Sequence, residues 1–300
     1  GEFIAESENG EVVNDAVYRR NLEVQEQLNI KLNYSIQPGG VDFGQYATSL
    51  RKSNMAGDQA YDILAMYAYF AVTITSEKLM YNLCDLPYFA PEKPWWNKSF
   101  TDEMTLFDQL YFAVGDLSLT STQCIHAIFF NKQLIGDYFG DLNLYNAVEE
   151  GKWTIDYFYD LVKGVYADLN GNSEIDGDDM YGVALNGVST PVDAYLDAFD
   201  LKITEKDSDG IPKLVYKNER TISAYEKIYN LMFNNTGVGF YPATIESYLL
   251  VQDKFNNSET MFLFDMFHAT NRLRNMNDAY GVLPMIKYDE AQSGYYTNVS

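Results

Sequence analysis

The stretch LSLTSTQCIHAIFFNKQLIGDYF, residues 117–139, decides the expected fold because it joins three patterns in one run. Its first seven residues are polar and prone to β structure, which is typical of a crossover between two domains. Residues 124–130 then form an apolar run of buried-strand length, and residues 132–139 carry helical signals. The stretch therefore predicts a boundary between two lobes, followed by a strand and a helix of the second lobe.

Helical and strand patterns also alternate on the N-terminal side of this stretch. Asn14 is predicted to cap a helix that presents Val17, Val24 and Leu28 on its inner face. Strands are expected at residues 30–36, 61–67 and 109–114, and further helices at residues 43–55 and 73–83. Such alternation indicates βαβ units and a mainly parallel sheet in this first lobe.

The C-terminal side has the pattern of a second α/β lobe with a mainly parallel sheet. Thr154 is predicted to cap a helix whose apolar residues, among them Phe158 and Leu161, recur at helical spacing. The sequence DSDG at residues 207–210 marks the tip of a hairpin. Further strands are expected at residues 180–185, 261–264 and 280–283, and further helices at residues 192–199, 220–233 and 244–255.

Length and composition fit two lobes. A chain of 300 residues, of which 47% are hydrophobic, can bury more than one core. We therefore expect α/β lobe 1 at residues 1–118 and α/β lobe 2 at residues 119–284. A final segment, residues 285–300, is expected to return toward lobe 1 after Pro284.

Charge and hydropathy exclude some partners. The chain has 43 acidic and 21 basic residues and a formal net charge of -22, which repels phosphate backbones and argues against nucleic acid. The longest nearly apolar run, residues 65–74, has about half the length of a membrane-spanning helix. No charged start with an apolar run opens the sequence, so any signal peptide is expected to lie outside this chain.

Catalytic motifs do not occur in the sequence. It contains no GxSxG, HExxH, P-loop, GxGxxG or CxxC motif, which argues against an enzyme. The two histidines, His126 and His268, are each more often structural than catalytic in such a setting. A glycan-active hydrolase with a carboxylate pair stays open as the alternative, because the separation of carboxylates cannot be read from a sequence. Cys84 and Cys124 form either one disulfide bridge or two buried thiols.

The sharpest motif is DLNGNSEIDGDD, residues 168–179, which has oxygen-bearing residues at positions 1, 3, 5, 7, 9 and 12, as an EF-hand calcium loop does. The expected ligands are the side chains of Asp168, Asn170, Asn172, Asp176 and Asp179 and the carbonyl of Glu174. Two features depart from the pattern, since Ser173 stands where glycine is usual and position 12 is Asp instead of Glu. We expect one structural Ca²⁺ ion, with an ordinary acidic turn as the alternative.

Several segments follow one another in a recognisable order. They are NDAVYRRNLEVQEQLNI (14–30), YDILAMY (61–67), KPWWNKS (93–99), IFFNKQLI (128–135), GKWTID (151–156), the DxNGNxxID loop with DDMYGVA (168–184), and YGVLPMIKYDE (280–290). In this order and spacing they resemble family 1 extracellular solute-binding proteins over nearly the whole chain. Their order is more specific than any single piece.

The resemblance implies a two-lobed, periplasmic-binding-protein-like fold whose hinge-linked lobes close around a ligand. It implies capture of a sugar or oligosaccharide for ABC permease subunits, outside the cell, and we expect a monomer. It also implies a cell-surface lipoprotein of a Gram-positive bacterium, attached through an N-terminal cysteine that this chain lacks. Compared with the family pattern, an opening strand and a C-terminal helical portion are missing, so we expect the chain to be cut short at both ends.

The predicted strand ends give the expected ligand site, because ligands of open α/β sheets bind beyond the carboxyl ends of strands. The expected ligand-binding residues are Met66, Tyr67, Tyr69, Gln123, His126, Asn186, Phe267 and His268. For the aromatic residues among them, core packing is the alternative. Trp95 and Trp96 are either a brace of the first lobe, which the resemblance favours, or a platform for sugar rings.

Overall fold

The computed structural model describes residues 2–36, 43–187 and 189–299. The chain forms two compact units, Gly1–Thr120 and Ser121–Ser300. Across the described ranges, no helix combines the length and the apolar character that crossing a membrane requires.

The first unit is built from helices and loops. Its elements are α1 (Val12–Leu28), α2 (Phe43–Ala56), α3 (Ala68–Thr75), a short 3-10 turn (Leu83–Asp85), α4 (Lys98–Met104) and the start of α5 (Leu119–Gln123). Its described residues form no strand and contain only isolated bridges, from Trp96 to Gly115 and from Leu106 to Gln109. The strands predicted at residues 61–67 and 109–114, and the mainly parallel sheet of this lobe, are therefore wrong. The strand predicted at 30–36 is likewise absent.

The strand predictions failed in this unit because an apolar pattern becomes a strand only where a neighbouring strand and a covering layer receive it. In YDILAMY, Ile63 is 83% exposed and so contributes to no core. The buried cluster of this unit is small, and it consists of Ala47 and Leu50 from α2 and Ile74 from α3.

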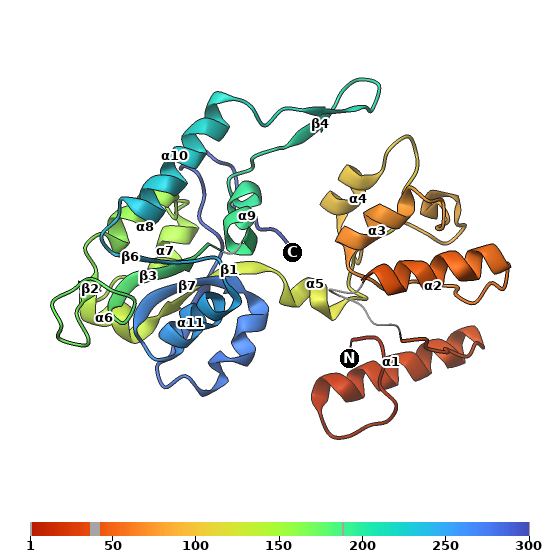
Figure 1. Cartoon of the computed structure of the whole chain (residues 1–300), viewed down its shortest axis with the longest axis horizontal. Helices are drawn as coiled ribbons and strands as arrows, with labels where there is room; N and C mark the ends of the chain where they lie inside the picture. The colour runs from red at the N-terminus through yellow and green to blue at the C-terminus, as the bar shows by residue number, and fades with distance from the viewer. Residues whose placement is uncertain (1, 37–42, 188, 300) are drawn as a thin grey trace. The chain divides into compact units, whose positions relative to one another are not determined.

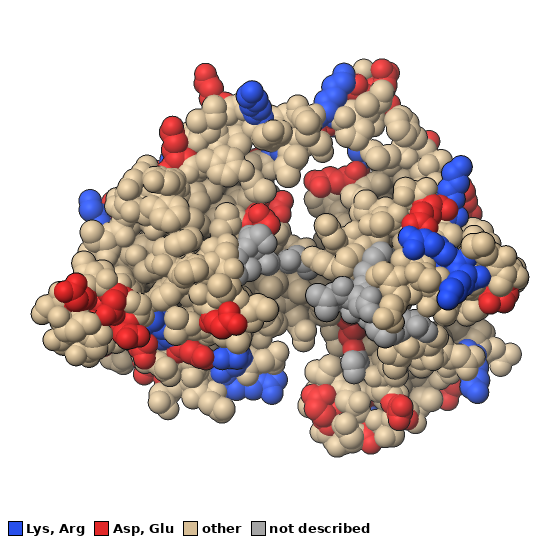
Figure 2. Space-filling model, viewed as in Figure 1, with Lys and Arg blue, Asp and Glu red and all other residues tan. Residues whose placement is uncertain are grey.

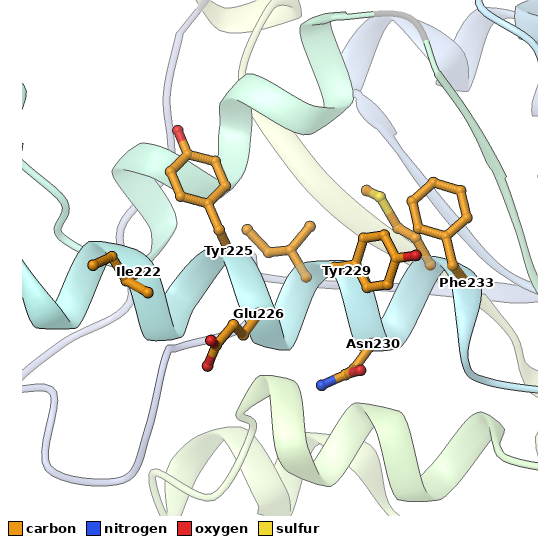
Figure 3. A pocket seen from close by; sticks show the side chains of 8 residues that line it. Ile222, Tyr225, Glu226, Tyr229, Asn230 and Phe233 are labelled. Carbon is orange, nitrogen blue, oxygen red and sulfur yellow. The ribbon is translucent and has the colours of Figure 1, made fainter. Parts of the chain in front are cut away.

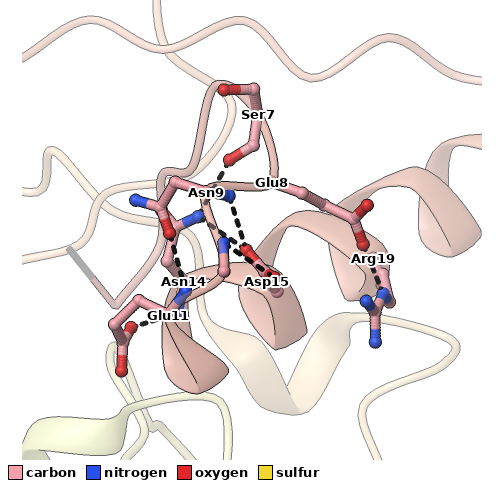
Figure 4. Close-up of polar contacts among 8 residues, drawn as sticks. Ser7, Glu8, Asn9, Glu11, Asn14, Asp15 and Arg19 are labelled. Atoms are coloured by element: carbon pink, nitrogen blue, oxygen red, sulfur yellow. Dashed lines mark hydrogen bonds and ion pairs between the residues drawn. The ribbon is translucent and has the colours of Figure 1, made fainter.

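The N-terminus of α1 is fixed by carboxylates (Figure 4). Glu11, not Asn14, is the N-cap, and its carboxylate accepts a hydrogen bond from the Asn14 amide at 2.7 Å. Asn14 lies inside the helix and donates its side-chain amide to the Ser7 carbonyl at 2.8 Å. Asp15 accepts a hydrogen bond from the Asn9 amide at 2.8 Å, and this bond lowers the pKa of Asp15. Glu11 thus accepts a hydrogen bond from a free N–H group of the first turn, and Asp15 ties the residues before the helix to it.

The WW loop braces the turn at Gly115. The Asp116 amide donates to the Trp95 carbonyl at 2.9 Å. A Cβ atom at Gly115 would lie 2.3 Å from the Trp95 carbonyl oxygen, so this close approach requires glycine. Trp96 packs against Phe89 with ring centroids 5.1 Å apart, whereas Trp95 is exposed. These contacts support the interpretation of the pair as a brace.

The second unit contains a six-stranded sheet with the order β2-β3-β7-β1-β8, in which β6 also pairs with β3. The strands of this unit are β1 (His126–Asn131), β2 (Tyr166–Ala167), β3 (Met180–Asn186), the separate hairpin β4 (Thr204–Lys206) and β5 (Pro212–Leu214), β6 (Val238–Tyr241), β7 (Thr260–Met266) and β8 (Tyr280–Leu283). β3 is parallel to β6 and β7, but β1 is antiparallel to β7 and β8, and β2 to β3. The expected mainly parallel sheet is therefore a mixed sheet. A strand buried on both faces has the same apolar pattern whichever way its neighbours run.

Helices cover both faces of this sheet (Figure 1). They are α6 (Lys132–Phe139), α7 (Leu144–Glu149), α8 (Ile155–Val162), α9 (Ser189–Ala198), α10 (Glu219–Phe233) and α11 (Ile245–Asn256), with 3-10 turns at Phe267–Asn271 and Leu273–Asn275. On one face, Val251 and Phe255 of α11 pack against the sheet. On the other face lies the larger core, which includes Trp153 and Phe158. The α/β class expected from the sequence is confirmed in this unit.

Local signals of the second unit were predicted well. Thr154 is the N-cap of α8 and accepts a hydrogen bond from the Tyr157 amide at 3.2 Å. The DSDG sequence joins β4 to β5, where the Gly210 amide donates to the Asp207 carbonyl at 3.0 Å. Both signals act through contacts between residues close in sequence, which explains why they could be predicted.

Residues 285–299 belong to the second unit. The Ile155 amide donates to the Lys287 carbonyl at 2.9 Å, and Gln292 donates its side-chain amide to the Ala198 carbonyl at 2.8 Å. Near its end the segment runs beside the entry to β1. It thereby contributes residues to the sheet edge described below.

Candidate functional site

The carboxyl ends of four strands lie at one edge of the sheet in the second unit. β3, β6 and β7 are parallel, and β8 has the same direction because β7 and β8 are both antiparallel to β1. The amino end of β1 therefore lies at this edge too. We call it the carboxyl edge, and it is the candidate binding site because ligands of α/β sheets bind beyond the carboxyl ends of strands.

Four of the predicted ligand residues lie at the carboxyl edge. His126 is the first residue of β1 and pairs with Met266, the last residue of β7. Asn186 is the last residue of β3 and is buried. Phe267 and His268 follow β7 directly, in a short 3-10 turn, and both are partly exposed. The structure therefore brings together residues that are up to 142 positions apart (268 minus 126).

Of the other four predicted residues, Gln123 lies three residues before β1, and Met66, Tyr67 and Tyr69 belong to the first unit and follow no strand. Gln123 is exposed at the end of α5. Met66 belongs to the first unit and packs against the small cluster of α2 and α3. Tyr67 and Tyr69 are exposed at the start of α3, with ring centroids 6.1 Å apart, and both rings contact Phe70. In their own unit they form an exposed aromatic cluster.

A pocket of about 260 Å³ opens at the carboxyl edge. Its walls include His126, Phe267, Pro284 and the tyrosines Tyr295 and Tyr296. Small-molecule sites are usually concave and mostly apolar, with a few polar groups that fix the orientation of the ligand. This pocket has that composition, because aromatic and aliphatic walls surround one imidazole.

His126 lines the pocket and has one buried ring nitrogen, Nδ1, without a hydrogen-bond partner among the described residues. The residue is 3% exposed. Its backbone is fixed, since its amide donates to the Asn298 carbonyl at 3.3 Å and its carbonyl accepts from the Thr297 hydroxyl at 2.7 Å. Burial lowers the pKa of His126 and favours the neutral ring. A neutral imidazole has one donor and one acceptor, so it can bind a hydroxyl group in either role.

A buried carboxylate network lies at the same edge, and none of its central residues was predicted. Asp265 is 3% exposed and accepts hydrogen bonds from the Tyr248 hydroxyl at 2.9 Å and the Gln252 side-chain amide at 2.7 Å. The Met266 amide donates to it as well, at 2.7 Å. The Tyr248 oxygen also lies 3.1 Å from Nε2 of His268. The signal in the sequence was the one carboxylate that interrupts the apolar run MFLFD.

The charge of Asp265 is balanced by hydrogen bonds. Over the described ranges, no ion pair joins Asp265 to a Lys or Arg side chain. Burial, and next the nearby Asp265, raises the pKa of Tyr248 far above its ordinary value. The phenol therefore keeps its proton and donates it to the carboxylate.

The loop at residues 168–179 joins β2 to β3 at the opposite edge of the sheet, and Figure 2 shows acidic side chains gathered over it. Asp168 accepts a hydrogen bond from the Ser173 amide at 2.9 Å. Ser173, at position 6, has a φ of 63°, the left-handed conformation that glycine favours. The Glu174 carbonyl accepts a hydrogen bond from the Tyr166 hydroxyl at 3.3 Å. The loop has the turn that its spacing predicts, between two strands.

The predicted calcium ligands converge in part. The side-chain amides of Asn172 and Asn170 donate to one oxygen of Asp176, at 2.8 and 3.4 Å. Asp179 is buried, and its carboxylate accepts the Tyr166 hydroxyl at 2.7 Å. In the described part of the chain, no three His, Cys, Asp or Glu side chains are grouped as a metal site. The donor set suits a hard cation, but binding requires the two amides to turn and Asp179 to exchange its tyrosine partner.

A larger and more open hollow, of about 610 Å³, follows the outer face of α10 (Figure 3). Ile222, Tyr225, Tyr229 and Phe233 lie along it, and each is more than 50% exposed. The rings of Tyr229 and Phe233 are 5.0 Å apart between centroids. Because its walls come from one helix face, this hollow does not enclose a ligand as the pocket at the carboxyl edge can.

Neither Cys84 nor Cys124 forms a disulfide bridge. Cys84 is exposed in the first unit, and Cys124 is partly buried just before β1. The disulfide bridge that the sequence left open is therefore not formed. The alternative of two buried thiols is wrong for Cys84, because this residue is exposed.

The sequence matches no protein-family model and no curated protein. Among solved structures, UspC of M. tuberculosis matches with a TM-score of 0.56 at 15% identity, over 92% of this chain and 66% of UspC. The GacH receptor of Streptomyces glaucescens, solved unliganded and with acarbose, gives a TM-score of 0.49 at 14% identity, over 93% of this chain and 64% of GacH. An ABC transporter solute-binding protein of Agrobacterium radiobacter K84, in complex with ribitol, gives 0.42 at 11% identity, over 95% and 68%.

The likeness to UspC confirms the periplasmic-binding-protein-like fold. At 15% identity it shows the fold alone. The chain spans about two thirds of the length of these proteins.

Proposed function

We propose that this chain is an extracellular solute-binding protein that captures a sugar or oligosaccharide at the carboxyl edge and delivers it to the permease of an ABC importer. The observation that carries the proposal is the pocket at this edge, with aromatic walls and the unpartnered Nδ1 of the buried His126. The fold of UspC and the segments that resemble family 1 solute-binding proteins support it.

The pocket offers both kinds of contact that a sugar needs. The rings of Phe267, Tyr295 and Tyr296 are apolar faces for the C–H groups of a sugar ring. His126 is a hydrogen-bonding group in the pocket wall for its hydroxyls, and His268 follows Phe267 directly at the same edge of the sheet. Micromolar affinity corresponds to about -8 kcal/mol, which a few such contacts supply after the cost of ordering the ligand.

The cellular setting that we propose follows the resemblance. The protein acts as a monomer on the outside of a Gram-positive cell, where a lipid anchor outside this chain holds it at the membrane. The permease is its protein partner, and the net charge of -22 disfavours nucleic acid. A structural Ca²⁺ ion in the loop at residues 168–179 completes the proposal.

Binding without reaction is favoured over the hydrolase alternative. Glycoside hydrolysis uses two carboxyl groups about 5 to 10 Å apart across the bond that is cleaved. The hydrogen-bonded network described at the carboxyl edge contains one carboxylate, Asp265, and its contacts are to Tyr248, Gln252 and Met266. We therefore expect no cleavage of any glycan that binds, which reducing-end release over a long incubation measures.

A thermal-shift screen over sugars, alditols, amino acids and peptides tests the ligand class. We expect sugars to raise the melting temperature, and we expect His126→Ala to weaken the best sugar about tenfold in calorimetry, which is the loss of about one hydrogen bond. Tyr225→Ala, on the outer face of α10, is the matched control and should leave the affinity unchanged. If peptides stabilise the protein and sugars do not, the carbohydrate assignment is wrong.

A further inference from the structure

Three side chains at the carboxyl edge form a continuous chain of hydrogen bonds. The Tyr248 hydroxyl lies 2.9 Å from Oδ1 of Asp265 and 3.1 Å from Nε2 of His268. The rings of Tyr248 and His268 are nearly parallel, with an angle of 23° between their planes and 6.4 Å between centroids. The imidazole is therefore held in one orientation by a partner that is itself held by a buried carboxylate.

The protons of this chain can be assigned by counting donors. Asp265 receives three hydrogen bonds and acts as an ionised acceptor. Tyr248 has one proton, and it points to Asp265 because two oxygens at 2.9 Å repel each other without a proton between them. Toward His268 the Tyr248 oxygen can then only accept. Nε2 of His268 must therefore carry a proton, and in a ring with a single proton Nδ1 is left as an acceptor.

Nδ1 of His268 has no hydrogen-bond partner in the described part of the chain. The residue is partly exposed. An acceptor beside the buried carboxylate of Asp265 favours a ligand atom that carries a proton. Carboxylate and phosphate oxygens, which only accept, would face one acceptor and one negative charge.

We propose that Asp265 and Tyr248 are positioning residues that fix His268 as a hydrogen-bond acceptor, so that the solute presents a hydroxyl or amino group there and anionic groups are rejected. The part of this inference that concerns the ligand rests on the proposed function of the carboxyl edge. The part that concerns the position of the proton on the His268 ring does not. The selectivity comes from the orientation of one proton in Tyr248. Neither positioning residue needs to touch the solute.

Nitrogen NMR of the imidazoles tests the positioning in the ligand-free protein. The chain has two histidines, so His126→Gln assigns both pairs of ring nitrogens. At about pH 8 we expect His268 to show a protonated Nε2 and an unprotonated Nδ1. Tyr248→Phe should give a mixture of the two tautomers, and Tyr225→Phe, the control on α10, should leave the spectrum unchanged. A wild-type His268 protonated at Nδ1 would overturn the proposal, whether or not the Tyr248 variant folds.

Calorimetry with glucose, glucosamine and glucuronate tests the selectivity. We expect glucose and glucosamine, which have no carboxylate, to bind at least about tenfold more tightly than glucuronate, and Tyr248→Phe to reduce that ratio about threefold or more. Equal affinity for glucuronate would refute the rejection of anions. If the ring has the expected tautomer but no sugar in the wider screen binds, the proposed function fails while the positioning stands. If sugars bind and His268 is protonated at Nδ1, the positioning fails while the proposed function stands.

Discussion

The two edges of the sheet in the second unit hold negative charge in opposite ways. At the loop edge, Asp168 is exposed and Asp176 is partly exposed, and both accept hydrogen bonds from neighbours within the same loop. At the carboxyl edge, Asp265 is buried and accepts hydrogen bonds from α11 and its own strand. Strand β3 connects the two edges, since it begins directly after the loop and ends at Asn186.

The helix α11 shows how different the two edges are. Near its C-terminus, buried Lys254 donates to the Asp179 backbone carbonyl at 3.0 Å and pairs with Glu259 at 3.2 Å, so a full positive charge balances Glu259 directly before β7. Nearer its N-terminus, Tyr248 and Gln252 offer Asp265 neutral donors only. A carboxylate that is hydrogen-bonded only to neutral donors still acts on a nearby ligand through its negative charge, whereas a carboxylate paired with a cation has most of its charge cancelled.

The largest expected effect is the loss of Asp265. Asp265→Ala leaves the Tyr248 hydroxyl, the Gln252 amide and the Met266 amide without an acceptor in a buried place. We expect the free energy of unfolding to fall by about 3 kcal/mol, as read from the midpoint of urea unfolding.

Asp176→Ala is the matched control at the loop edge. Its partners are exposed loop groups that water can satisfy, so a clearly smaller loss is expected. Equal losses for the two variants would show that burial does not distinguish the two edges.

Calcium removal should act on the loop edge alone. If the loop holds one ion in the folded state only, free calcium at a hundred times the dissociation constant stabilises the protein by about 2.7 kcal/mol. Excess chelator should then lower the melting temperature of the wild type. It should not change that of Asp168→Ala, because this variant lacks the Asp168 carboxylate. In the wild type that carboxylate accepts a hydrogen bond from the Ser173 amide. An unchanged wild-type melting temperature in chelator would leave the loop as an acidic turn.

The contrast between the edges also explains what the sequence could predict. The left-handed turn at Ser173 and the cap at Thr154 depend on residues within a few positions, so their spacing carries the information. Four strands of the second unit were predicted within about two residues, because three of them are apolar runs buried on both faces and β8 is buried on one face. The network of Asp265 could not be predicted, since Tyr248 becomes its partner only when α11 packs on the sheet.

The first unit shows the converse. Residues 61–67 have the same apolar character as a buried strand, yet they form none in the structure, and Ile63 is exposed. A short apolar run indicates that a segment can be buried, but it does not indicate which element of the protein buries it. Met66, Tyr67 and Tyr69 were chosen on this run, so their predicted place after a strand is wrong, although their role toward a ligand stays a prediction.

A pH change should weaken the carboxyl edge before the loop edge. Burial lowers the pKa of His126 below its ordinary value of 6.5, so the unfolded chain takes up a proton before the folded one as the pH falls. Stability is therefore full above about pH 6.5 and declines below it by up to about 1.4 kcal/mol per pH unit, until the folded ring protonates too. Urea midpoints at about pH 7.5 and about pH 5.5 measure this.

His126→Asn removes the titration and should flatten this part of the pH dependence. The other histidine remains in that variant, so the difference between the two proteins isolates His126. An identical decline in both proteins would show that His126 is not the group responsible.

The smallest expected effect is a gain at Ser173. This residue has a φ of 63° at the position where EF-hand loops have glycine, and a side chain in the left-handed region costs about 1 kcal/mol. Ser173→Gly should relieve that strain and, since the strain is present with and without an ion, raise the melting temperature in chelator as well as in calcium. The greater freedom of glycine in the unfolded chain offsets part of the gain. Ser208→Gly, at an exposed position of the DSDG turn whose φ is not positive, is the control and should not stabilise the protein. A destabilised Ser173→Gly would mean that the serine contributes a contact outweighing its strain, and the loop edge would then depend on more than its backbone geometry.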